Sequence, residues 1–222
     1  MQTEPILERS YSPQETRRQY ARVAWFYDLW GRLTEDKAVD RLLELAEVED
    51  GCAVLEVAVG TGRLFARLVE KNPAGRNEGI DLSSDMMDHA RRRLARSPSA
   101  KAGHLMQGNA YALPFEDAGF DYLFNTYLVD LLPAADQLCV LGEFRRVLKP
   151  GGRLAIAVFS FGEKRVNRFW YWIAKHFPEL LTGCRPVDVT PTLRHLGFRI
   201  LHQEEISQNT FPSTIVIAEK PR

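Results

Sequence analysis

Short apolar runs alternate with longer segments in which apolar residues recur every three to four positions along most of this chain. The runs predict buried strands, and the longer segments predict amphipathic helices. Strands are expected at 52–59, 104–108, 120–125 and 153–159, and a further strand is expected to end with residues 78–81. Helices are expected at 63–71, 84–96, 135–148 and 167–175. This alternation predicts an α/β protein with a doubly wound, mostly parallel sheet.

The C-terminal part of the chain breaks the alternation. A short helix at 192–196 precedes two strand-like runs at 198–206 and 211–219. The four residues that separate these runs suit a hairpin, so we expect a seven-stranded sheet that finishes with an antiparallel pair. Residues 149–152, Lys-Pro-Gly-Gly, are expected to form a tight turn before the fifth strand.

The N-terminal part is helical in pattern. Ser12 and Pro13 are typical of a helix start, and a second helix is expected at 35–47. We therefore predict an N-terminal helical cap over residues 1–48 and a Rossmann-like domain over residues 49–222.

One glycine turn is the most informative feature of the sequence. The Val-rich strand at 52–59 runs directly into Gly60-Thr61-Gly62, and a helix pattern follows at once. Glycines permit a sharp turn and a close approach of a ligand to the main chain. Asp81 closes the next strand, 25 positions after Glu56. Together these residues predict a site for a nucleoside-containing cofactor at the carboxyl ends of parallel strands.

Two other nucleotide sites fit this turn less well. The dinucleotide fingerprint requires a third glycine where this chain has Phe65, and no Gly-Lys-Ser/Thr follows to form a phosphate loop. A nicotinamide-dependent dehydrogenase is kept as an alternative, against which Phe65 and the antiparallel finish both argue.

Five motifs occur in a fixed order along the chain: 56–62, 79–83, 108–115, 120–121 and 148–152. In that order they resemble the motifs of the class I S-adenosylmethionine-dependent methyltransferases, over roughly residues 15–220. Residues 20–28, Tyr-Ala-Arg-Val-Ala-Trp-Phe-Tyr-Asp, resemble the branch that contains the ubiquinone/menaquinone-biosynthesis enzymes and bacterial phosphatidylethanolamine N-methyltransferases.

The resemblance implies a cofactor site for S-adenosylmethionine. Glu56 is expected to accept hydrogen bonds from the methionine ammonium, and Asp81 to accept them from the two ribose hydroxyls. The other expected cofactor contacts are Tyr20, Ala58, Gly60, Thr61, Gly62, Leu82, Met86, Asn109, Ala110 and Asn125. Taken alone, Glu56 could only pair with a basic neighbour, and Asp81 could only cap the helix that begins near Ser84.

Two of these positions depart from the family pattern. Asn109 stands where the family usually has Asp, and Ala58 stands where many members have Gly. Because an amide carbonyl still accepts a hydrogen bond, we expect Asn109 to remain compatible with adenine binding.

Methyl transfer needs proximity, orientation and exclusion of water more than a catalytic triad, and no triad is visible. Tyr20 and Tyr27 resemble lid residues over the methionine end, although they could simply pack helix against sheet. Asn125 is expected near the transferring methyl, and Tyr127 or Asp130 is a candidate base or orienting residue.

The expected activity is methyl transfer to a small or amphiphilic acceptor, with a quinone precursor or a phospholipid head group favoured. A noncatalytic S-adenosylmethionine-binding regulatory module is the alternative. The aromatic segment Phe169 to Trp172 suits either a membrane surface or packing into the core of the protein, and the latter is favoured.

Composition narrows the class of protein. The 29 basic and 29 acidic side chains balance, so no nucleic-acid partner is expected. Three widely spaced cysteines lack a disulfide or metal pattern, which predicts no metal site and a reducing, cytoplasmic location. No apolar window approaches the ~20 residues of a membrane span. The oligomeric state is left open.

Overall fold

The computed structural model describes residues 31–162, 168–176 and 184–222. The helix start predicted at Ser12 and Pro13 and the two expected lid residues, Tyr20 and Tyr27, lie outside these ranges.

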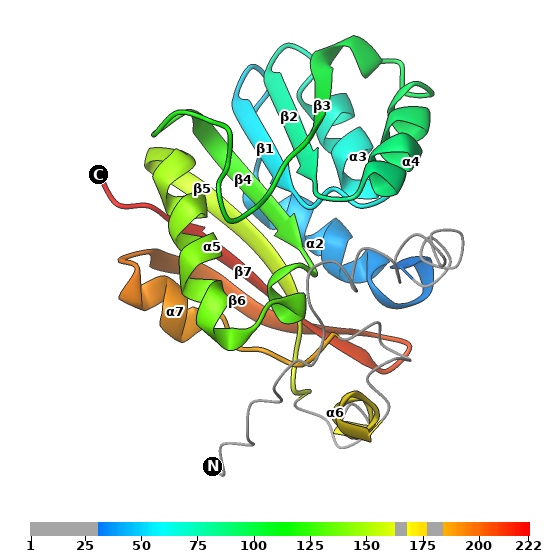
Figure 1. The fold of residues 1–222 in the computed structure, drawn as a ribbon, viewed down its shortest axis with the longest axis vertical. Helices are drawn as coiled ribbons and strands as arrows, with labels where there is room; N and C mark the ends of the chain where they lie inside the picture. The colour runs from blue at the N-terminus through cyan, green and yellow to red at the C-terminus, as the bar shows by residue number, and fades with distance from the viewer. Residues whose placement is uncertain (1–30, 163–167, 177–183) are drawn as a thin grey trace.

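Within the described ranges, seven strands form one sheet in the order β3-β2-β1-β4-β5-β7-β6 (Figure 1). Their bounds are β1 Ala53–Val57, β2 Arg76–Asp81, β3 Gly103–Gln107, β4 Phe120–Thr126, β5 Leu148–Phe159, β6 Arg199–Gln208 and β7 Phe211–Glu219. Strands β1 to β5 pair in parallel, whereas β7 pairs antiparallel with both β5 and β6. The predicted fold class, with its C-terminal antiparallel hairpin, is confirmed.

The strand order reverses between β1 and β4, because the chain adds β2 and β3 on one side of β1 and then β4 and β5 on the other. In an open α/β sheet, the crevice at such a reversal is where ligands bind, outside the carboxyl ends of the strands. The fold therefore places a ligand site beside the glycine turn that follows β1.

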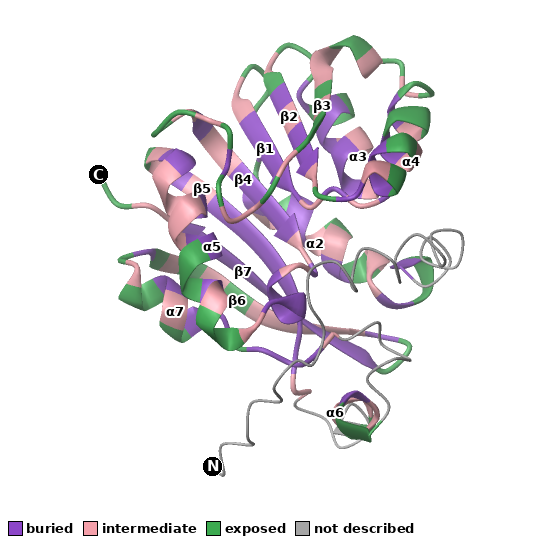
Figure 2. Ribbon diagram, viewed as in Figure 1, coloured by how far each residue is buried: buried purple, intermediate pink, exposed green. Residues whose placement is uncertain are grey.

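Helices cover both faces of the sheet (Figure 1). They are α2 Asp36–Ala46, α3 Arg63–Lys71, α4 Ser84–Leu94, α5 Ala134–Val147, α6 Arg168–His176 and α7 Thr190–His195, with short 3₁₀ turns at Ala100–Ala102 and Val129–Leu131. Val54 faces α2 and α3, whereas its neighbour Leu55 faces α5 and α7. This alternation buries the central strands on both faces, as Figure 2 shows.

Helix α2 belongs to this core. Its side chains Leu42 and Leu43 pack with residues of β5 and β7, so the helix covers the sheet face that α3 also covers. The predicted division into a cap at 1–48 and a domain at 49–222 stays a prediction, because most of the cap lies outside the described residues.

Phe65 occupies the position of the third glycine in the dinucleotide fingerprint, and the sheet accommodates its ring by means of glycines on the strands. A Cβ on Gly79 of β2 would lie 2.9 Å from the Phe65 ring, and one on Gly103 of β3 would lie 3.1 Å from it. Helix α3 therefore packs closely against the sheet through a large side chain, and Phe65 is buried.

Two predicted turns need correction. Residues 149–152 do not precede the fifth strand: β5 begins at Leu148, and the register of its pairing with β4 shifts there, with Gly151 at φ 80°. The loop between the last two strands is also shorter than predicted. Asn209 and Thr210 alone form the turn, both with positive φ, as two-residue hairpins with a matching twist require.

Candidate active site

A cavity of about 570 Å³ opens at the carboxyl ends of β1, β2 and β4. This volume is in the range of small-molecule sites. The structure brings most of the predicted site residues to its wall: Glu56, Ala58, Gly60, Thr61, Asp81, Leu82, Met86, Asn109, Ala110 and Tyr127. Gly62, Asn125 and Asp130 do not line it.

Asp81 joins the end of β2 to the glycine turn. Its Oδ2 accepts the Gly60 amide at 2.8 Å, and its Oδ1 accepts the Ser83 amide at 2.8 Å. Burial raises the pKa of this carboxyl, and the hydrogen bonds from the main-chain amides oppose that shift. Ser83, rather than Asp81, caps α4, because its side chain accepts the Met86 amide. Asp81 is thus held at the cavity wall in a fixed orientation.

No basic side chain of the described residues pairs with Glu56. Its side chain, only 1% exposed, lies under the turn, and its Oε2 has no hydrogen-bond partner within the described structure. Burial and the neighbouring Asp81 carboxylate raise the pKa of Glu56 well above its ordinary value. A buried oxygen without a donor is costly, so this carboxyl is suited to a cationic or N–H group of a ligand.

The turn itself needs three residues with left-handed backbone. Ala58, Gly60 and Gly62 have φ of 63°, 52° and 76°. A Cβ on Gly60 would meet no atom within 4 Å, so this glycine leaves open space. A Cβ on Gly62 would lie 2.8 Å from Ala90 Cα, so Gly62 allows α4 to approach α3. At Gly60 the turn therefore exposes its main chain to the cavity. At Gly62 the turn packs closely against α4.

The side of the cavity beside β3 suits a planar, apolar group. Met86 is buried in the wall, whereas Leu82 is 44% exposed. Asn109 Oδ1 accepts the Tyr111 amide at 3.1 Å, which leaves one lone pair of that oxygen for a ligand. Tyr111 also donates its hydroxyl to Asp136 at 2.8 Å, and both residues line the wall.

The side beside β4 is more apolar, and the hydroxyl of its tyrosine is already hydrogen-bonded. Leu128, Leu131 and Leu132 line it, together with Tyr127. The Tyr127 hydroxyl is hydrogen-bonded to Ser213 Oγ at 2.8 Å, and burial raises the pKa of this hydroxyl well above its ordinary value. A phenol with these contacts is a poor proton acceptor.

Asn125 and Asp130 serve the framework behind this wall. Asn125 is fully buried, and its Nδ2 donates to the Val57 carbonyl at 2.8 Å, which ties β4 to β1. Asp130 is fully buried and accepts the Phe159 amide at 3.1 Å. The structure thus does not bring these two predicted site residues to the cavity.

Glu35 is a cavity residue that the sequence reasoning missed. It lies at the N-terminal cap position of α2, where the residue as a whole is half-buried, and it lines the cavity. Burial and the Asp130 carboxylate raise its pKa from 4.5 to about 8, although Arg63 opposes the shift. The available signal, an acidic residue at a helix start, is also typical of an ordinary helix, so it does not mark a site.

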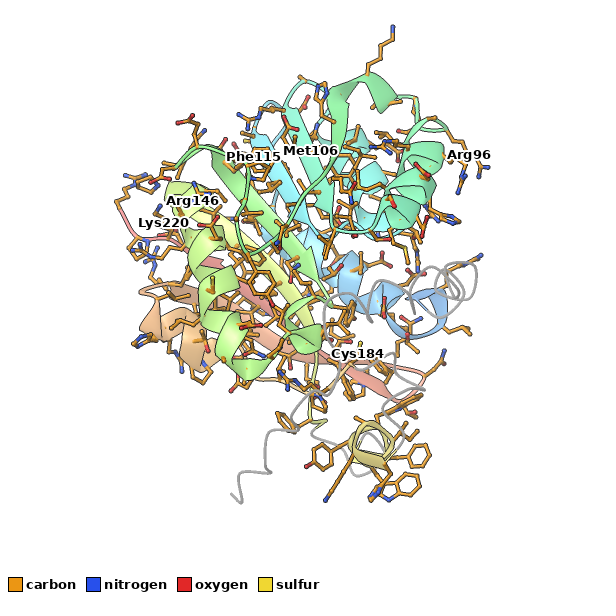
Figure 3. All side chains as sticks on the ribbon, in the orientation of Figure 1. Arg96, Met106, Phe115, Arg146, Cys184 and Lys220 are labelled. Atoms are coloured by element: carbon orange, nitrogen blue, oxygen red, sulfur yellow. The ribbon has the colours of Figure 1, made fainter. Side chains whose placement is uncertain are left out.

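The opposite end of the sheet holds charged groups that already have partners (Figure 3). Arg146 pairs with Glu143 at 2.7 Å and with Asp117 at 2.8 Å, and Lys220 donates to the carbonyls of Arg145 and Leu148. Residues 31–162, 168–176 and 184–222 contain no cluster of ligands for a metal ion and no helix that could cross a membrane. Cys52, Cys139 and Cys184 form no disulfide with one another.

Comparison with known proteins shows which proteins this chain resembles. Residues 54–152 match the family of methyltransferase domains. Demethylmenaquinone methyltransferase of Lactococcus lactis is 37% identical over 58% of this chain and 47% of its own length. Malonyl-(acyl-carrier protein) O-methyltransferase of Pectobacterium atrosepticum is 32% identical over 74% of this chain and 61% of its own length. This chain spans about half the length of several curated relatives that it matches.

Solved structures share the fold. A methyltransferase of Aquifex aeolicus that depends on S-adenosylmethionine has a TM-score of 0.65 at 20% identity, covering 95% of this chain and 100% of its own. The (4+2)-cyclase SpnF has a TM-score of 0.75 at 18% identity and covers 98% of both chains. These findings confirm the resemblance that the five motifs predicted.

Proposed function

We propose that this chain, a class I S-adenosylmethionine-dependent methyltransferase in sequence and fold, transfers the methyl group of S-adenosylmethionine to the ring of a reduced quinone precursor. The observation that carries the proposal is the division of one cavity into a polar side, which holds Glu56, Asp81 and Gly60, and an apolar side beside β4. The polar side suits the methyl donor, and the apolar side suits an uncharged ring.

The residues on the polar side fit S-adenosylmethionine. Glu56 Oε2 has no partner within the described structure and suits the methionine ammonium, while Gly60 leaves room for a ligand against the main chain. The fixed carboxylate of Asp81 is positioned to accept two hydroxyls of a ribose. When bound, S-adenosylmethionine supplies an electrophilic methyl group on a sulfonium, with a leaving group that needs no further activation.

The chain's own contribution is orientation and exclusion of water. Two carboxylates from adjacent strands hold opposite parts of one ligand, and the apolar wall of Leu128, Leu131 and Leu132 keeps water away from the transfer. A quinone precursor is favoured over a phospholipid head group because this wall is apolar and because one of the relatives above acts on demethylmenaquinone.

The noncatalytic alternative requires a different interior. A module that only binds S-adenosylmethionine needs no space for an acceptor, whereas here the cavity extends past the glycine turn to Leu131, Leu132 and Pro133. The space next to β4 therefore favours an enzyme.

The test is a two-acceptor assay with detection of S-adenosylhomocysteine. One arm offers a short-chain prenylated naphthohydroquinone that lacks the ring methyl, and the other offers phosphatidylethanolamine vesicles. Product formation with the hydroquinone alone supports the proposal, and product with phosphatidylethanolamine alone contradicts the choice of acceptor. Binding of S-adenosylmethionine without turnover of either acceptor would favour the noncatalytic module.

A further inference from the structure

We propose that Glu35, at the start of α2, is the group that accepts the proton of the methyl acceptor. This inference rests on the proposed function. It concerns the side of the cavity beside β4, where the Tyr127 hydroxyl is already hydrogen-bonded to Ser213 and Asp130 does not reach the cavity.

Glu35 lies near residues that follow β4 and near Arg63 at the start of α3. The ribose carboxylate, Asp81, ends β2, which lies on one side of β1. Tyr127 and the Val129–Leu131 turn follow β4, on the other side of β1, and Glu35 acts electrostatically on Tyr127 and is itself affected by Asp130. The Glu35 carboxyl therefore faces the space that S-adenosylmethionine, bound across β1 and β2, would leave for the acceptor.

The other carboxyls on the cavity wall have partners or different positions. Asp36 forms an ion pair with Arg63, Asp136 accepts the Tyr111 hydroxyl, and Glu70 accepts the Ser97 hydroxyl. Asp81 is held by the main-chain amides of Gly60 and Ser83, and Glu56 lies below the turn beside Asp81. The described part of the cavity wall contains no histidine.

Glu35 differs from all of these. No side-chain hydrogen bond or ion pair of its carboxyl is found within the described residues, and its surroundings let it carry a proton near neutral pH. The charged groups that act on it are Asp130 from the Val129–Leu131 turn, Arg63 from α3 and its own neighbour Asp36. The two carboxylates raise its pKa and the guanidinium lowers it, with burial as the largest cause of the rise to about 8. A proton acceptor works best with a pKa close to the working pH.

The proposed step balances in atoms and electrons. The hydroxyl proton of the hydroquinone moves to the Glu35 carboxylate, and the freed electron pair passes through the ring to the carbon that bonds the methyl. The carbon–sulfur electron pair remains on sulfur. The ring-carbon proton then moves to the ring oxygen, which restores the aromatic hydroxyl, and Glu35 releases its proton to solvent.

The experiment compares Glu35→Gln with the matched control Glu44→Gln, an exposed residue of the same helix. Calorimetry with S-adenosylmethionine in two buffers of different ionisation enthalpy measures affinity and proton release together. We expect both variants to bind within about threefold of the wild type. We expect proton release on binding to fall in Glu35→Gln only, because a bound sulfonium favours the ionised form of a nearby carboxyl.

Turnover of the naphthohydroquinone provides the second measurement. We expect Glu35→Gln to lose about 10²–10⁴-fold in kcat and to lose the inflection near neutral pH, while Glu35→Asp recovers part of both. Unchanged proton release, or an unchanged pH profile in an active enzyme, overturns the proposal for Glu35. Loss of S-adenosylmethionine affinity in Glu35→Gln also overturns it, because Glu35 would then hold the methyl donor. Failure of the wild type to bind S-adenosylmethionine instead contradicts the proposed function itself.

Discussion

The Gly60 amide donates to Asp81 Oδ2 at 2.8 Å, so the glycine turn after β1 and the acidic end of β2 form one unit. The main-chain oxygen of Asp81 also accepts the Gly108 amide at 3.0 Å, which adds the end of β3. Three strand ends are thus tied together through one residue, and a ligand held there meets a framework that is already organised.

Replacing Asp81 with Asn should weaken S-adenosylmethionine binding by about 10–100-fold, because the charge-assisted hydrogen bonds to the ribose are lost and an amide nitrogen cannot accept the main-chain donors. Calorimetric titration measures this loss. Asp88→Asn, an exposed residue of α4, is the matched control and should bind as the wild type does. Equal affinity in Asp81→Asn and wild type would remove Asp81 from the cofactor site.

The three left-handed positions of the turn should respond differently to substitution. Ala58→Gly should raise the free energy of unfolding by up to about 1 kcal/mol, because it relieves a backbone conformation that costs a residue with a Cβ. Gly62→Ala should lower the free energy of unfolding by about 2–4 kcal/mol, since it adds a clash with Ala90 to that strain. Urea unfolding measures both changes.

Gly60→Ala provides the contrast with Gly62→Ala. Its Cβ would enter open space, so the free energy of unfolding should fall by only about 1 kcal/mol, whereas S-adenosylmethionine affinity should fall because the new methyl occupies ligand space. Equal destabilisation by the two substitutions would contradict the packing described for Gly62.

Glu56→Gln should change the pH dependence of stability. Burial, followed by the Asp81 carboxylate, raises the pKa of Glu56 above its ordinary 4.5, so the folded protein holds this proton more tightly than the unfolded chain. Glu56 therefore makes its full contribution to the free energy of unfolding below pH 4.5, the ordinary pKa of the unfolded chain. This contribution is lost as the pH rises through the higher pKa of the folded protein. The variant should be more stable than the wild type at about pH 8, by a margin that shrinks toward about pH 5.

Unfolding curves without S-adenosylmethionine at several pH values test this margin. The same variant should bind S-adenosylmethionine about tenfold more weakly, because a neutral amide replaces the carboxylate beside the ammonium. A stability difference that does not vary with pH would mean that Glu56 is not protonated in the folded protein.

Tyr127→Phe separates a structural role from a catalytic one. It removes the hydrogen bond to Ser213 and should cost about 1 kcal/mol of unfolding free energy. We expect turnover of the naphthohydroquinone to stay within about threefold of the wild type, because the hydroxyl is engaged away from the acceptor space. A loss of more than about 10²-fold would restore Tyr127 as the base.

The local pattern of the sequence determined most of the fold. The strand at 211–219 and the helix at 63–71 lie where the periodicity placed them, because burial on one or both faces of a sheet imposes that periodicity. The turns were harder to predict, since Asn209 and Thr210 adopt positive φ through the pairing of the two strands that flank them.

The sequence by itself also determined that the glycine turn and Asp81 meet at one cavity, because each follows a strand, and parallel strands bring their carboxyl ends together. Only the tertiary structure decided which residues line the side of that cavity beside β4. Asn125 lies near the end of β4 and Asp130 follows that strand, which is the neighbour of β1 in the sheet. Both side chains are nevertheless fully buried behind the cavity wall. Glu35 reaches the cavity because α2 packs across β5 and β7, distant segments whose contact with α2 no local pattern encodes.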